Sequence, residues 1–61
     1  MTYGVYYDGI LITTIENVNE IQLNDDHVVF YNQSNELIAL VNKSRIEVIQ
    51  RVENNPPTFN V

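Results

Sequence analysis

The chain has 61 residues, no cysteine, one histidine and a formal net charge of −5. A chain of this size buries only about 60% of the surface that it exposes when unfolded, so small domains usually add disulfides, a metal ion or a partner subunit. The lack of cysteine excludes disulfides and thiolate metal sites, and the negative charge argues against nucleic-acid binding, which needs a basic surface. We therefore expect one small domain supported by oligomerisation.

The beginning of the chain, Met1 to Gly4, has no basic segment followed by an apolar run. A signal peptide needs both of these features, and a membrane span needs a much longer apolar stretch than this sequence contains. We expect a cytoplasmic protein with no membrane association.

The first 23 residues predict three strands. Asp8-Gly9 lies between two apolar segments, residues 3–7 and 10–15. This dipeptide favours a type I′ hairpin, because both central residues of that turn need positive φ. Residues 18–23 alternate apolar and polar side chains, as a strand with one wet face does, and Asn24-Asp25-Asp26 supplies the following turn.

A second hairpin is predicted from residues 27–31 and 36–41, with the polar turn 32–35 between them. If Tyr31 pairs with Glu36, one face of this hairpin is wholly apolar. We expect that face to be buried, together with apolar residues from the first three strands. The expected core residues are Tyr3, Val5, Ile12, Ile21, Val28, Phe30, Leu37, Ala39 and Val41.

Residues 45–53 allow two interpretations. Ser44-Arg45-Ile46-Glu47 matches the capping box that begins many helices. The β-branched residues that follow favour a strand instead, and the spacing of Ile46 and Val48 fits the period of two. We favour the strand and retain a short C-terminal helix as the alternative. Residues 54–61 contain two prolines and are expected to form a flexible tail.

Together these segments predict an all-β fold, a single antiparallel meander of five to six short strands. Such a sheet can curl into a small barrel or a half-sandwich. Residues 1–53 form the domain and residues 54–61 the tail. Lys43, Arg45 and Arg51 are the only basic residues, and we expect them to pair with acids on neighbouring strands.

Asp25-Asp26-His27 is the one cluster of residues that could carry catalysis or bind a metal. Adjacent side chains on a strand point to opposite faces, so these three do not converge on one ion. A turn with a solvated histidine is the simpler interpretation. The sequence contains no nucleophile elbow, phosphate-binding glycine loop or dinucleotide fingerprint. We expect no enzymatic activity, no cofactor and no metal.

A second set of apolar residues remains after one face of the sheet is buried. Each aliphatic side chain in it contributes about 1.5–3 kcal/mol if it is fully buried. We predict that this set forms a face for self-association, most simply in a two-fold dimer, or for a foreign partner. The alternative is that the C-terminal segment folds back over it. The predicted association face consists of Tyr6, Leu11, Val29, Tyr31, Ile38 and Leu40.

The segments DGILITT and HVVFYNQSNELIALVNKSRIEVIQ, within residues 8–52, resemble short all-β proteins of phages and prophages of low-GC bacteria. In those proteins a strand, a polar turn, an apolar strand and a KSRI-type ending recur. The resemblance implies no catalytic residues. It implies an accessory protein that is made during infection and that binds or inhibits a host protein. The alternative is a structural or assembly component of a virion or larger complex.

Overall fold

The computed structural model describes residues 1–53 and 58–61, and these residues form strands joined by short turns. A single turn of 3₁₀ helix, η1 (Lys43–Arg45), interrupts them. The strands are β1 (Tyr3–Tyr7), β2 (Ile10–Ile15), β3 (Glu20–Leu23), β4 (His27–Tyr31), β5 (Leu37–Asn42), β6 (Val48–Arg51) and β7 (Thr58–Asn60). The all-β prediction is confirmed.

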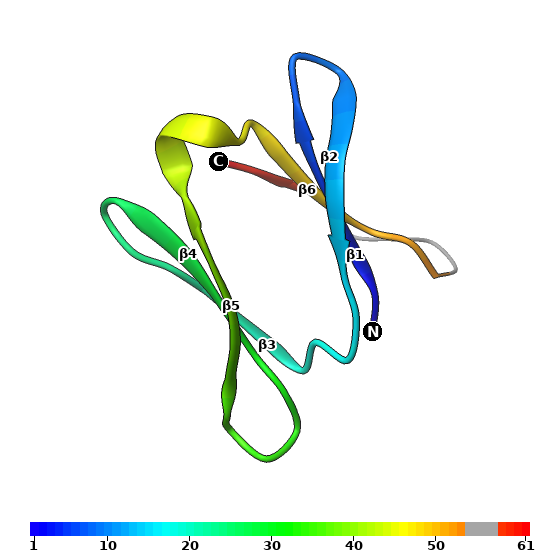
Figure 1. Ribbon diagram of the computed structural model, residues 1–61, viewed down its shortest axis with the longest axis vertical. Coiled ribbons are helices and arrows are strands. Elements are labelled where there is room, and N and C mark those ends of the chain that lie inside the picture. Colours follow the sequence, from blue (N-terminus) through cyan, green and yellow to red (C-terminus); the bar gives the residue numbers. More distant parts are fainter. Residues whose placement is uncertain (54–57) are drawn as a thin grey trace.

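The strands form two antiparallel sheets that face each other (Figure 1). The four-stranded sheet has the order β2-β1-β6-β7, and the three-stranded sheet has the order β3-β4-β5. The architecture is thus an open two-layer sandwich, and neither sheet closes into a barrel. It departs from a simple meander where β6 returns, late in the chain, to pair with β1.

Both predicted hairpins are present, and their turns have the expected chemistry. Asp8 and Gly9 have φ values of 54° and 74°, so the predicted type I′ turn is confirmed. In the second hairpin the side-chain oxygen of Asn32 accepts hydrogen bonds from the amides of Ser34 (2.9 Å) and Glu36 (3.0 Å). Asn35 then adopts a φ of 61°, which asparagine tolerates better than most residues.

Each hairpin contains a register shift in its second strand. In the first hairpin Tyr6 pairs with Leu11 but Val5 pairs with Thr13, which leaves Ile12 as an extra residue. In the second, the pairing shifts in the same way and leaves Ile38 extra. An inserted residue changes which side chains face the core.

The shifts make two core predictions wrong. Ile12 is 58% exposed because Thr13 takes the position opposite Val5. Leu37 is 54% exposed because it pairs with Tyr31, whereas Ala39 pairs with Phe30. An ideal alternating pattern counted from the turn places both residues on the wrong face.

The core lies between the sheets. Val5 and Ile49 come from the four-stranded sheet and Val28 and Phe30 from the three-stranded sheet, and all four are fully buried. Tyr3 is also buried, and its ring centroid lies 6.2 Å from that of Phe59 in β7. The predicted core residues that pack at its margin are Ile21, Ala39 and Val41, and the buried residues that were not predicted are Val18, Ile46 and Ile49.

The C-terminal part of the chain completes the four-stranded sheet. The strand interpretation of residues 45–53 is confirmed by β6, and the only helical element there is the single turn η1. β7 pairs with β6, so the prediction of a flexible tail is wrong for residues 58–60. Residues 54–57 of that predicted tail lie outside the described residues.

Two isoleucines allow a direct test of this core. Replacing Ile49 with Val removes one methylene from a fully buried position, and we expect it to lower the free energy of unfolding by about 0.5–1.5 kcal/mol. The matched change Ile10→Val, at a side chain that is 63% exposed, should change it by less than about 0.5 kcal/mol. Urea unfolding followed by circular dichroism measures both variants. Equal effects of the two substitutions would show that the core is placed wrongly.

Candidate interaction surface

The six residues of the predicted association face do not share one surface. Tyr6 pairs with Leu11 and lies on the outer face of the four-stranded sheet, because its neighbour Val5 points into the core. Val29 pairs with Leu40 and lies on the outer face of the other sheet, because Val28 and Phe30 point inward. These two faces point away from each other across the core.

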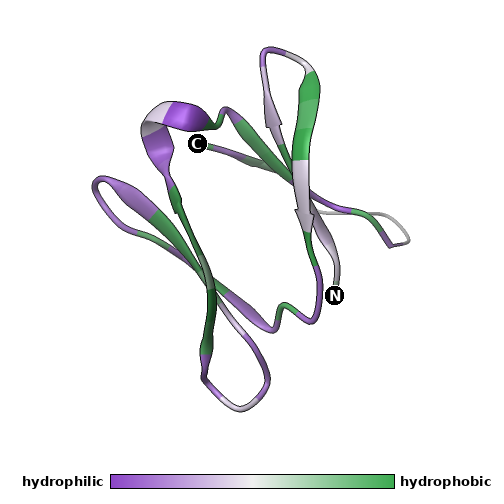
Figure 2. Ribbon diagram, viewed as in Figure 1, coloured by the Kyte–Doolittle hydropathy of each residue, from purple (hydrophilic) through white to green (hydrophobic). Residues whose placement is uncertain are grey.

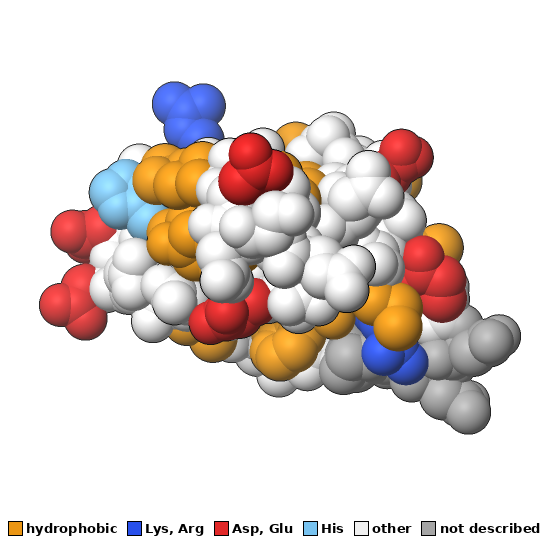
Figure 3. Space-filling model, turned by 90° about the horizontal axis from the view of Figure 1, so that it is seen from below, with side chains coloured by type: hydrophobic (Ala, Val, Ile, Leu, Met, Phe, Trp, Pro, Cys, Tyr) orange, Lys and Arg blue, Asp and Glu red, His pale blue; other side chains and the backbone are white. Residues whose placement is uncertain are grey.

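The outer face of the three-stranded sheet brings three of the six predicted residues together, Val29, Tyr31 and Leu40, while Ile38 is the extra residue of the bulge in β5. Val29, on the central strand, is only 4% exposed because side chains of its own sheet surround it, among them its pairing neighbours Gln22 and Leu40. Tyr31 is half-buried and Leu40 is 54% exposed. Seen from below, hydrophobic side chains gather on part of the surface with acidic side chains near them (Figure 3).

The outer face of the four-stranded sheet is shaped by Gly4. A Cβ atom at this position would lie 3.0 Å from the Tyr6 ring and 3.1 Å from Cδ1 of Leu11. The two side chains therefore lie across the glycine and cover the backbone of β1, which leaves Tyr6 half-buried. The absence of a side chain at residue 4 is what allows this close approach.

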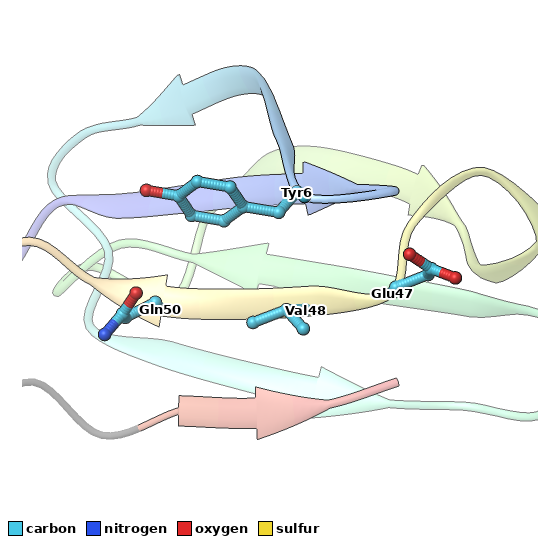
Figure 4. Close-up of a pocket in the computed structure, with 5 residues that line it drawn as sticks. Tyr6, Glu47, Val48 and Gln50 are labelled. Carbon is cyan, nitrogen blue, oxygen red and sulfur yellow. The ribbon is translucent and has the colours of Figure 1, made fainter.

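A shallow hollow of about 250 Å³ lies beside Tyr6 and is lined also by Gly9, Glu47, Val48 and Gln50 (Figure 4). The carboxylate in this hollow, that of Glu47, has a structural role. Oε1 of Glu47 accepts a hydrogen bond of 2.6 Å from the amide of Asp8, so this side chain holds the β1–β2 turn. The hollow is smaller than the roughly 300–1,000 Å³ typical of ligand pockets.

Asp25, Asp26 and His27 lie where the turn between β3 and β4 ends. The two aspartates are exposed and the histidine is half-buried, opposite Asn42 of β5. Within residues 1–53 and 58–61 no group of three or more histidine, aspartate or glutamate side chains is placed to hold a metal ion. No ion pair or hydrogen bond among the described residues joins these three side chains.

Six of the eight exposed large apolar side chains of the described strands lie on two edge strands, β2 and β5, and the other two are Tyr7 in β1 and Leu23 in β3. We call the six side chains on β2 and β5 the open edge. They are Ile10 (63% exposed), Leu11 (49%), Ile12 (58%), Leu37 (54%), Ile38 (37%) and Leu40 (54%). Figure 1 shows both strands at the front of the molecule, each at the border of its sheet, and Figure 2 shows apolar residues along both.

Ile12 and Leu37 were missed as surface residues because ideal alternation assigns them to the buried side of the sheet. No local signal in the sequence identifies the exposed run Ile10-Leu11-Ile12, because the equally apolar run Val28-Val29-Phe30 lies in the buried central strand of the other sheet.

Neither edge strand carries a charge or a proline. Soluble proteins usually protect exposed sheet edges with charged side chains, proline or bulges, and here only the bulges are present. The acids lie instead in the connections, for example Asp8 and Glu16 on either side of β2. The open edge can therefore accept another extended segment through backbone hydrogen bonds and apolar contacts.

One carboxylate with a shifted pKa also has a structural role. Both oxygens of Glu53 lie 2.9 Å from the amide nitrogen of Thr2, and this hydrogen bond lowers the pKa of Glu53 because it stabilises the charged form. The amide of Val52 in turn donates to the carbonyl oxygen of Thr2 (2.8 Å). These bonds fasten the end of β6 to the beginning of β1.

The chain matches no known family model, no curated protein and no solved structure. Among the residues that the structure describes, no helix is long and apolar enough to cross a membrane.

The contact between Glu53 and Thr2 predicts a pH-dependent loss of stability in Glu53→Gln. The folded pKa lies below the ordinary value of 4.5, so the carboxylate stabilises the fold above that pH and stops doing so as the pH falls through the folded pKa. The variant should be less stable than the parent at pH 7, and the difference should disappear in acid.

Thermal unfolding between pH 2 and pH 7 measures this difference, with Glu16→Gln as the control, because the Glu16 carboxylate bonds to no described residue. A difference that persists unchanged at low pH would contradict the assignment.

Proposed function

We propose that this protein is a small non-enzymatic binding module that acts by contact with another polypeptide through the open edge. The observation that supports this most is the gathering of six exposed apolar side chains on two uncharged edge strands. Each of the two strands exposes three of these side chains within a short stretch, and exposed apolar side chains that cluster on a soluble protein commonly mark an interaction site. Unpaired backbone groups along the same strands add the capacity to bind a strand.

The polar groups of the described hollows favour binding over catalysis. Glu47 is occupied by the amide of Asp8. The hollow of about 380 Å³ between β2 and η1 is lined by Tyr7, Ile12, Ser44 and Arg45, which pair apolar surface with a hydroxyl and a guanidinium but supply no general base beside a nucleophile.

The biological setting in this proposal comes from the sequence resemblance to short phage and prophage proteins. On that basis the module is an accessory protein that acts in the cytoplasm of an infected cell and binds or inhibits a host protein. An apolar surface of this kind suits the role, because a protein that inhibits by contact needs only to cover part of the surface of its target. The resemblance over residues 8–52 includes both edge strands.

A structural or assembly component is the second candidate. It is favoured by one feature of the fold, the presence of an open edge strand in each sheet on the same side of the molecule (Figure 1). Strands of neighbouring subunits could extend both sheets. The two candidates differ in the partner, which is a host protein in the first case and a subunit of the same assembly in the second.

The double substitution Ile12→Lys and Leu40→Lys tests the proposal, because it places a charge on each edge strand at exposed positions. The matched control is Gln33→Lys with Ser34→Lys, which adds the same charge in an exposed turn. We expect the parent and the control to associate with a defined partner, and the open-edge variant to remain folded but lose that partner.

Light scattering at micromolar concentration detects self-association, and affinity capture from a host lysate with mass spectrometry identifies a foreign partner. The proposal is wrong if the open-edge variant keeps every partner of the parent, or if the parent has none.

A further inference from the structure

The edge strand β2 has an apolar length between two acidic ends. Its six residues, Ile10 to Ile15, are all uncharged. Asp8 lies in the turn before it and Glu16 directly follows it. At the turn end Glu47 accepts the hydrogen bond from the amide of Asp8 and holds the turn, but it lies on the β6 side of β1, away from β2. The outer edge of β2 therefore has a hydrophobic middle and a negative charge at each end.

Among the residues that the structure describes, the backbone of β2 pairs on one side only, with β1. The side chains of its first three residues are exposed, from 49% at Leu11 to 63% at Ile10, whereas Ile15 at its end is half-buried against the core. An extended peptide that adds to this edge gains main-chain hydrogen bonds, and pockets for its alternate side chains give specificity. The hollow of about 380 Å³ beside Ile12 has room for one such side chain.

The other apolar edge, β5, has a different charge pattern. Glu36 precedes the strand, but Lys43 follows it. A segment added to β5 would meet a negative charge at one end and a positive charge at the other. The acidic residues at the two ends of β2 therefore favour a segment that is basic at both ends, whereas the opposite charges at the ends of β5 do not.

Charge also argues against a second copy of this chain as the strand that covers β2. Pairing two β2 strands antiparallel around Ile12 places Asp8 of each copy opposite Glu16 of the other, so the same repulsion occurs twice. The net charge of −5 on each chain adds to this repulsion. The bulge at Ile12 twists the edge, which further disfavours stacking of identical chains.

We propose that the open side of β2 receives an extended segment of a different protein, apolar in its centre and carrying lysine or arginine at both ends. Asp8 and Glu16 are eight positions apart, so the basic residues of that segment lie about eight residues apart as well. The inference rests on the proposed function and specifies the chemistry of its partner. Arg45 lines the hollow beside Tyr7 and Ile12 and brings one positive charge near this edge, so the attraction for basic residues comes from Asp8 at one end and Glu16 at the other.

Two fluorescent peptides test the inference directly. Both contain six alternating valine and threonine residues, and they differ only in carrying two lysines or two glutamates at each end. Fluorescence anisotropy with the full chain should show the lysine peptide binding at least about tenfold more tightly, because attraction at both ends replaces repulsion. Amide protons on the outer side of β2 should become protected from exchange when the lysine peptide binds.

Three variants locate the binding. Ile12→Lys, on β2, should abolish it, whereas Gln33→Lys, which adds the same charge in an exposed turn outside the open edge, should leave it unchanged. Asp8→Asn combined with Glu16→Gln should reduce the preference for the lysine peptide to about twofold or less, and raising the salt concentration should do the same. Asparagine tolerates the positive φ of residue 8, so the turn is retained.

Equal affinity for the two peptides, or no binding of either, would overturn the inference. So would loss of binding in Gln33→Lys but not in Ile12→Lys. If light scattering shows a dimer that Ile12→Lys disperses, a second copy occupies β2; the inference then fails while the proposed function stands. If the open edge supports neither peptide binding nor any association in the tests above, both fail.

Discussion

The packing of Val5 and Ile49 against Val28 and Phe30 holds the two sheets together, and the remaining features of the molecule depend on it. These four side chains are the largest that are completely buried. In a chain of 61 residues without disulfides, one such core is all that the hydrophobic effect can supply. Each sheet must turn one face inward to form it, and the apolar side chains that do not fit lie on the outer faces or at the edges.

The position of β6 determines which strand lies at the border of the four-stranded sheet. A two-stranded hairpin is marginally stable by itself, and the β1–β2 hairpin gains its support when β6 pairs with β1 and brings Ile49 beside Val5. β7 then extends the sheet on the far side of β6. Consequently β2 has no neighbour among the described residues on its outer side, although four of its six residues are apolar.

The sequence predicts the local parts of this structure well and the non-local parts poorly. Asp8-Gly9 specifies its turn through backbone sterics alone, and the alternation around Val28 and Phe30 identifies a buried face. The bulges at Ile12 and Ile38 are not visible in the sequence, because they follow from the fit between two strands. The pairing of β6 with β1, and of β7 with β6, depends on contacts between residues far apart in the chain.

The predicted association face likewise groups correctly the residues that are close together in the chain and groups wrongly those that are far apart. Val29, Tyr31 and Leu40 share an outer face because they lie in one hairpin, whose pairing can be read from its turn. Tyr6 and Leu11 belong to the other sheet, and no local pattern reveals that the two hairpins pack with their inner faces together. The open edge could not be predicted, because the run of three apolar residues in β2 has a counterpart in the buried strand β4.

Amide hydrogen exchange, measured by NMR on the dilute monomer, tests most directly the claim that one two-sheet core leaves the outer sides of β2 and β5 uncovered. The central strands β1 and β4 should exchange slowest, through global unfolding, while the outward amides of β2 and β5 exchange much faster. If those outward amides are as slow as the amides of β1 and β4, some part of the chain covers the edges and this description of the protein is wrong.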